Sequence, residues 1–157
     1  MKKRLICIVL SITLLFCLGV TGCAKSNKSG TVISIGSAKA KVGESVKIPV
    51  EISGNPGILA WNIVFKFDSE VLEYVGYDQG DLFSDYMAFE KAGQVGVNCI
   101  ENEDIKGDGK LITLEFKVIG DDIKKTQIAV DMEKSSICNN NEELITFTDE
   151  NGTVKIK

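Results

Sequence analysis

From residue 31 onward, apolar and polar residues of this chain alternate in short runs, the pattern of half-buried β-strands. Turn-forming residues separate the runs, and no segment shows apolar residues at helical spacing. Nine runs have this character: 32–36, 45–53, 58–68, 71–77, 86–90, 94–100, 110–119, 126–133 and 153–157. Nine short strands with one apolar side each predict an all-β fold of two packed antiparallel sheets. Pro49 cannot donate to a ladder, so its strand is expected near a sheet edge or bulged there.

The run 58–68 has an outer side unlike that of a solvated strand. One parity is apolar throughout and is expected to face the core: Leu59, Trp61, Ile63, Phe65 and Phe67. The other parity holds Ile58, Ala60, Asn62 and Val64 before its first charge at Lys66. In the run 110–119, by contrast, Glu115 and Lys117 lie on the side that should face water. Trp61 is therefore interpreted as a core residue, and the uncharged outer side needs another explanation.

Two further runs share this uncharged outer side. In 94–100, Gln94, Gly96, Asn98 and Ile100 lie opposite Val95, Val97 and Cys99. In 86–90, Met87 and Phe89 share a side opposite Ala88, so whichever side faces out, one face of this run lacks charge. A flat surface with few charges, on a chain rich in charges elsewhere, is typical of a protein-docking site. The alternative is that loops of the same chain cover this surface.

The first 22 residues have the three regions of a bacterial export signal. MKKR is basic, the following 16 residues are apolar, and Val20-Thr21-Gly22 are small residues before Cys23. Sixteen apolar residues fall short of the ~20 that a membrane-spanning helix needs. The segment is similar to a lipobox, so we expect cleavage before Cys23, lipid on its sulfur, and a polar tether over 23–30. The folded domain is expected over 31–157.

Removing the signal changes the charge balance of the chain. Lys2, Lys3 and Arg4 leave, so 15 lysines and no arginine remain against 22 acids, a formal charge of −7. No run of basic residues remains, which argues against nucleic acid or an anionic lipid surface as a partner. Of the remaining cysteines apart from Cys23, Cys99 and Cys138 are expected either to pair or to be two separate buried thiols.

No catalytic constellation stands out, so the chain is expected not to be an enzyme. It has no histidine, the usual base of serine and cysteine hydrolases, and none of the motifs GxSxG, SxxK or HExxH. Four aspartates in turns could hold calcium, but turn capping is the favoured interpretation: Asp104, Asp108, Asp121 and Asp122. No metal site is predicted.

Several stretches of the sequence resemble a known family. The segment 42–83, with IPV in one strand and D-x-x-V-L-E closing the next, resembles the first half of a cohesin domain. KGDGKLITLEFKV at 106–118 and the terminal GTVKI resemble later strands of the same family. The resemblance covers about 32–157. It implies a nine-stranded antiparallel jelly-roll sandwich that binds dockerins, the calcium-loaded helical modules of secreted polysaccharide-degrading enzymes.

The resemblance also implies a set of partner-binding residues, all on the strands discussed above. They are Ala60 and Asn62 in the third strand, Met87 and Phe89 in the fifth, and Asn98, Ile100 and Glu101 in the sixth. Asn62 stands where family members carry an aspartate, which leaves the dockerin specificity open. No cofactor is implied for this chain, since calcium is expected on the dockerin, and calcium on this chain stays open. An Asn62→Arg variant is expected to lose its partner without losing thermal stability.

The sequence thus predicts a cohesin-like module anchored by lipid to the outer face of a bacterial cell membrane. It would recruit a dockerin-bearing extracellular protein. One alternative is a carbohydrate-binding sandwich, which would need exposed rings among Phe83, Phe89, Tyr74, Tyr77 and Tyr86. The other is an adhesion or structural domain of the cell envelope without a dockerin partner.

Overall fold

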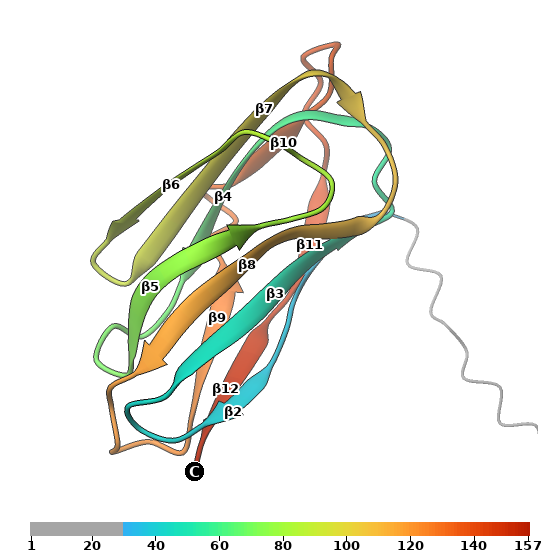
Figure 1. The fold of residues 1–157 in the computed structure, drawn as a ribbon. Helices are drawn as coiled ribbons and strands as arrows, with labels where there is room; N and C mark the ends of the chain where they lie inside the picture. The colour runs from blue at the N-terminus through green and yellow to red at the C-terminus, as the bar shows by residue number, and fades with distance from the viewer. Residues whose placement is uncertain (1–29) are drawn as a thin grey trace, which may run out of the picture.

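The computed structural model describes residues 30–157, which form two stacked β-sheets (Figure 1). The first sheet has the order β11 (Phe147–Glu150), β1 (Thr31–Ile35), β3 (Ser45–Ser53), β8 (Gly109–Val118) and β5 (Leu72–Gln79). The second has the order β2 (Ala38–Ala40), β12 (Gly152–Ile156), β9 (Lys125–Val130), β4 (Ile58–Lys66), β7 (Gln94–Ile105) and β6 (Tyr86–Lys91). In this sheet β10 (Ser136–Cys138) also pairs with β4. The predicted signal and Cys23 lie outside the described residues.

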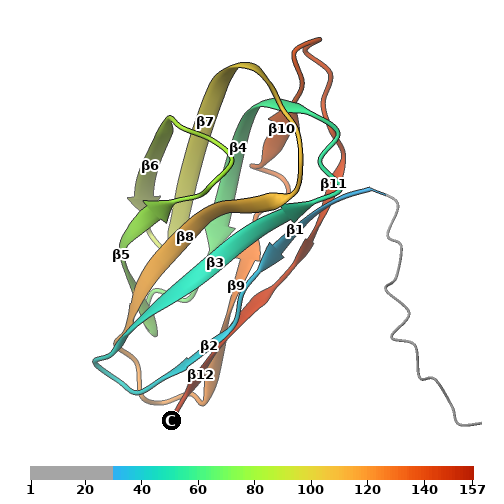
Figure 2. The ribbon, with the colours of Figure 1, turned by 45° about the vertical axis from the view of Figure 1, so that its right-hand side comes forward.

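The predicted all-β sandwich is confirmed, and each of the nine predicted runs corresponds to a strand. Three short strands, β2, β10 and β11, were not predicted. The expectation of purely antiparallel sheets is wrong at two edges, because β1 pairs parallel with β11 and β2 pairs parallel with β12. Both chain segments cross together from one sheet to the other, which keeps them parallel (Figure 2). The Thr153 N–H donates to Ser37 Oγ (2.9 Å) at this crossing.

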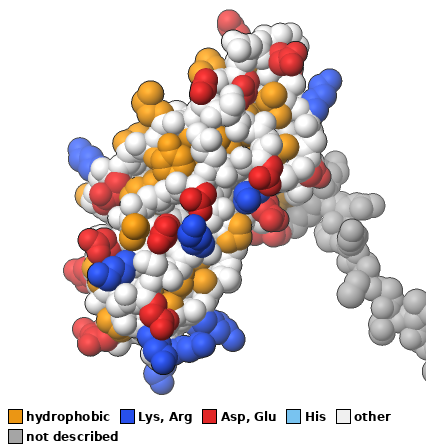
Figure 3. All heavy atoms as spheres, viewed as in Figure 1, with side chains coloured by type: hydrophobic (Ala, Val, Ile, Leu, Met, Phe, Trp, Pro, Cys, Tyr) orange, Lys and Arg blue, Asp and Glu red, His pale blue; other side chains and the backbone are white. Residues whose placement is uncertain are grey.

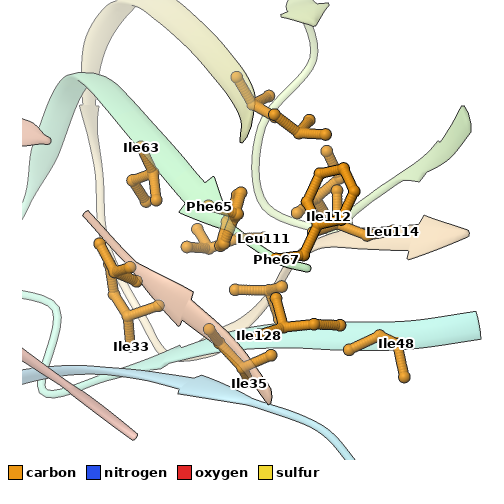
Figure 4. Packing of buried hydrophobic residues seen from close by; sticks show 14 of the residues in the cluster. Ile33, Ile35, Ile48, Ile63, Phe65, Phe67, Leu111, Ile112, Leu114 and Ile128 are labelled. Carbon is orange, nitrogen blue, oxygen red and sulfur yellow. The ribbon is translucent and has the colours of Figure 1, made fainter. Parts of the chain in front are cut away.

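The core lies between the sheets and consists of the inward parities of both (Figure 4). Phe65 of β4 and Phe116 of β8 are fully buried, as are Ile48 and Leu114. Each such side chain contributes roughly 1.5–3 kcal/mol when it leaves water. Trp61 is buried as predicted, and its ring meets those of Phe83 and Tyr86 edge to face at 5.9 and 5.7 Å. Within the described residues, no helix is long and apolar enough to cross a membrane.

The start of β4 departs from the predicted parity. Ile58, expected outside, is fully buried, whereas Leu59, expected inside, is only half-buried. The cause is a register shift, since Ile58 pairs with Ile105 while Ala60 pairs with Ile100. The extra residues of β7 at this point rotate the beginning of β4 by one position.

Pro49 lies in an interior strand, so the edge alternative is wrong and the bulge alternative holds. β3 lies between β1 and β8, and its register against β8 shifts between Val50 and Glu51. Pairing with β1 ends at Val50, where the chain of β1 turns away and the Gly36 N–H donates to the Pro49 carbonyl (2.8 Å). The missing N–H of Pro49 therefore costs no ladder hydrogen bond.

Candidate protein-docking face

The outer sides of β4, β7 and β6 form one surface, which we call the β4–β7–β6 face. The register aligns its side chains in rows across the strands. One row is Asn62, Asn98 and Met87; the next is Val64, Gly96 and Phe89; and Ala60 lies opposite Ile100. Six of the seven predicted partner-binding residues thus lie together on one face. Their role in binding a partner stays a prediction.

Three large apolar side chains of this face are exposed to solvent. Met87, Phe89 and Ile100 have exposed fractions of 69%, 52% and 66%. The ring of Phe89 lies directly over Gly96, in the space that a Cβ there would occupy. Gly96 is buried by this contact, which fixes the ring flat on the sheet. The alternative that the chain's own loops cover the surface fails for these three residues.

The two asparagines at the centre of the face are each half-buried but differ in their bonding. The Asn62 Nδ2 donates to the Lys134 carbonyl (2.7 Å) in the turn that leads to β10. A carboxylate has no donor for this bond, which is a physical reason for an amide where the family pattern has an aspartate. The Asn98 Oδ1 is buried and has no hydrogen-bond partner. The expectation that Asn62→Arg leaves stability unchanged therefore has to be revised, because the bond to Lys134 would be lost.

Glu101 is not brought together with the other predicted contacts. Its Oε1 accepts from the backbone N–H of Ser84 (2.6 Å), and both carboxylate oxygens lie within 3.1 Å of Ser84 Oγ. The Cys99 thiol is 3.8 Å from the same carboxylate. Glu101 thus holds the loop before β6 in place. By doing so it positions Tyr86, which opens that strand.

β10 adds to the face a part that the sequence did not indicate. It pairs with β4 so that Cys138 lies opposite Ala60, and Cys138 in turn bridges to Leu144. Leu144 is 77% exposed, which extends the apolar surface on the β10 side of Ala60, across the strand from Ile100. A three-residue strand after a turn has no alternation long enough to identify it. The sequence signal in this segment is the pair Leu144 and Ile145 after a run of polar residues.

Charged residues lie at the two ends of the face. Lys66 and Lys134 flank one end, and their Nζ atoms are 3.8 and 3.7 Å from the Asp131 carboxylate. At the other end, acidic side chains gather around the loop between β10 and β11 (Figure 3). Asp104 there accepts from the Asn140 N–H (2.7 Å), which joins this loop to the end of β7. An apolar centre with charged ends is typical of a protein interface.

The remaining alternatives can be placed in the structure. Cys99 and Cys138 are both free thiols, and they lie two strands apart on opposite faces of the sheet, so they do not pair. Asp104 and Asp108 accept backbone N–H bonds, and no three metal-ligating side chains converge within residues 30–157. Of the five rings that a sugar site would need, only Phe89 is exposed. The others are buried or half-buried: Phe83, Tyr74, Tyr77 and Tyr86.

The comparison with family models decides the family. Residues 31–156 match the cohesin domain. The chain belongs to the cohesin family. Cohesins bind dockerins in cellulosome complexes, and the cohesin domain is a non-catalytic protein-binding module.

Two curated relatives share part of this cohesin. Cellulosomal-scaffolding protein A of Acetivibrio thermocellus is 43% identical over 58 residues, which are 36% of this chain and 3% of that protein. Cellulosomal-scaffolding protein B of the same species is 40% identical over 58 residues, 36% of this chain and 8% of its own length. The cohesin thus spans a small fraction of the length of either relative.

Solved structures confirm the cohesin fold. The third cohesin of ScaC from Acetivibrio cellulolyticus, solved in complex with the ScaB dockerin, has a TM-score of 0.75 at 20% identity. The alignment covers 80% of this chain and 98% of that one. A non-cellulosomal cohesin from the archaeon Archaeoglobus fulgidus has a TM-score of 0.72 at 24% identity, covering 82% and 91%. At these identities the likeness concerns the fold.

Proposed function

We propose that this cohesin captures a dockerin-bearing extracellular protein on its β4–β7–β6 face. The observation that carries the proposal is the group of Met87, Phe89 and Ile100, which are exposed, apolar and adjacent in register on a sheet face without charges at its centre. Such a group costs solubility and gains free energy only when a partner covers it. Apolar and aromatic anchors at the centre of an interface carry most of its binding energy.

The proposal also includes the class of the partner and the place of the cohesin in the cell. The dockerin would belong to a polysaccharide-degrading enzyme, in keeping with the cellulosomal scaffolding proteins that the chain resembles. The lipobox around Cys23 would hold the cohesin at the outer face of the cell membrane. Two or more acyl chains at ~0.8 kcal/mol per buried methylene are enough for a stable anchor. The module would then act as an adaptor between an enzyme and the cell surface.

Calorimetric titration with a panel of calcium-loaded dockerin modules, type I included, tests the proposed face. We expect Ile100→Asp and Met87→Asp each to weaken binding by about 30-fold or more, because a desolvated carboxylate would replace an anchor. Val75→Asp is the matched control, since Val75 is 53% exposed on β5 of the other sheet. It should bind like the unaltered protein.

The results distinguish a wrong binding surface from a wrong partner class. Equal loss in all three variants would contradict the face, and unchanged binding in Ile100→Asp and Met87→Asp would do the same. A protein that binds no dockerin of the panel, with or without calcium, would contradict the dockerin function and favour the structural role in the cell envelope. Melting curves of the variants should coincide, because all three positions lie outside the core.

A further inference from the structure

Three lysines lie side by side on the outer surface of the second sheet, at its far edge from the β4–β7–β6 face. Lys155 of β12 pairs with Lys39 of β2 on one side and with Lys125 of β9 on the other. Neighbouring strands are about 4.8 Å apart, so the three side chains start within about 10 Å. Like charges directly opposite each other on a sheet are destabilising. The arrangement therefore costs stability unless an anion neutralises it.

These lysines line an open groove. The groove has a volume of about 690 Å³ and is bounded by Ser37, Ala38 and Thr153 as well as by the three lysines. A volume of this size accommodates a small ligand or a segment of a polymer. The ion pairs within residues 30–157 involve other lysines, namely Lys47, Lys66, Lys110 and Lys134. No carboxylate of the described chain is paired with the lysines of the groove.

More lysines surround the groove at the same end of the molecule. The backbone of Lys124 accepts from the Ile156 N–H, and the Lys157 N–H donates to the Ala40 carbonyl, each at 2.9 Å. Figure 3 shows basic side chains gathered at the end where the C-terminus lies in Figure 1. Beyond the predicted signal the sequence has no run of basic residues, yet the folded sheet has a basic cluster. Its members come from separate strands and meet only in the folded sheet.

We propose that this groove binds a linear phosphate-bearing polyanion. Lysine is a compact point charge that binds phosphate well, and three in a row match successive anionic groups along a chain. A flat anionic membrane fits less well, because the adjoining loops carry Glu44, Asp121 and Asp122, all exposed, which would approach the lipid headgroups with the lysines. None of these three acids lines the groove, so a polymer lying in it would contact the sheet surface and the lysines. The site is independent of the proposed docking face.

Titration of the purified protein with tripolyphosphate and long-chain polyphosphate tests the groove. Lys155→Gln removes the central charge, so we expect the Kd for polyphosphate to rise at least tenfold and its dependence on salt to decrease. Lys117→Gln on β8 is the matched control, since it removes one exposed lysine from the other sheet and should change the Kd less than twofold. Ile100→Asp should retain polyphosphate binding, which separates this site from the docking face.

Three results would contradict the proposal that the groove binds a polyanion. They are equal weakening by Lys155→Gln and Lys117→Gln, absence of polyphosphate binding, and binding to phosphatidylglycerol vesicles without binding to soluble polyphosphate. The last result would show a membrane contact instead. Thermal melting provides a second measurement: Lys155→Gln should melt at or above the temperature of the unaltered protein, because repulsion within the row is relieved. A lower melting temperature would mean that the lysines are not repelling one another.

Discussion

At the scale of single residues, Asn62 and Asn98 show how identical side chains can have opposite effects on stability. They lie directly opposite each other on β4 and β7. Asn62 ties the turn before β10 to the sheet through the Lys134 carbonyl, whereas the Asn98 oxygen is buried without a partner. A buried acceptor without a partner costs free energy, and a satisfied donor contributes about 1 kcal/mol. The sequence alone cannot distinguish the two positions, since both are outward amides in uncharged surroundings.

This difference predicts unequal effects of the same substitution. Asn62→Ala should lower the free energy of unfolding by about 1 kcal/mol, because the bond to Lys134 is lost. Asn98→Ala should change it by less than about 0.5 kcal/mol or raise it, because an unsatisfied oxygen is removed. Urea unfolding of both variants with a common m-value measures the difference. Equal destabilisation by the two variants would contradict the assigned bonding.

At the scale of elements, the sequence predicted what depends on alternation and missed what depends on pairing. The nine runs were found because each is long enough to show one apolar side, as β3 and β8 do. The short strands β2, β10 and β11 have three or four residues, and each exists because an edge of another strand is available to it. The bulge that buries Ile58 in place of Leu59 depends on the residues opposite it in β7. Periodicity within one strand carries no information about its neighbour.

In the candidate site, too, the sequence showed what alternation reveals and missed what depends on pairing between strands. Met87, Phe89 and Ile100 lie on uncharged sides of their strands, which a single sequence can show, and the resemblance to cohesins named them as contacts. Leu144 was missed because its place on the face depends on β10. The place of Glu101 apart from the other predicted contacts was not foreseen, because its bonds to Ser84 are set by a loop conformation. The lysine groove was missed because its members are far apart in the chain.

β10 covers the edge of β4 at Ala60 to Asn62, so a substitution in β10 should affect this part of β4 first. Ile137 is almost fully buried opposite Trp61. Ile137→Ala should lower the free energy of unfolding by about 2–4 kcal/mol, because it leaves a cavity in the core. β10 should unfold before the rest of the sheet, since a strand of three residues has few other contacts. Hydrogen exchange should then become faster at Ala60 to Asn62, which pair with β10, than at Phe65 and Lys66, which pair with β9. Uniform acceleration over the whole strand would show that β10 does not unfold separately.

At the scale of the whole molecule, the outer surface of the second sheet is divided into two regions. The β4–β7–β6 face offers apolar anchors, and the strands β2, β12 and β9 offer a row of lysines. The formal net charge of −4 over the whole sequence hides this division completely. If both proposals hold, the cohesin can hold a protein partner and a polyanion at once, because the two regions share no side chain.

The sandwich as a whole should lose stability in alkaline solution. Burial raises the pKa of Cys99 to about 12, with the charge of Glu101 adding to the effect, and burial raises the pKa values of Tyr74 and Tyr86 to about 12 as well. In the unfolded chain these groups ionise near their ordinary pKa values of 9 and 10, so the unfolded state releases protons first as pH rises. Their contribution to stability is therefore complete below pH 9 and is lost between about pH 9 and 12. Urea unfolding measured at half-unit steps should show this decline.

The variant Cys99→Ala removes one of the three groups whose pKa is raised and should make the decline shallower. It should also lower stability at neutral pH, because the packing of the buried thiol is lost. Cys138→Ala is the matched control, because it removes the other thiol and retains all three groups. It should keep the slope of the unaltered protein. A slope that is identical in all three proteins would mean that the buried thiol ionises at the same pH in the folded and the unfolded chain, and the decline would then come from the tyrosines and from general charge repulsion. We expect the shallower decline for Cys99→Ala. Cys99 lies opposite Trp61 and next to Glu101, so its thiolate would have to form beside a carboxylate and away from water.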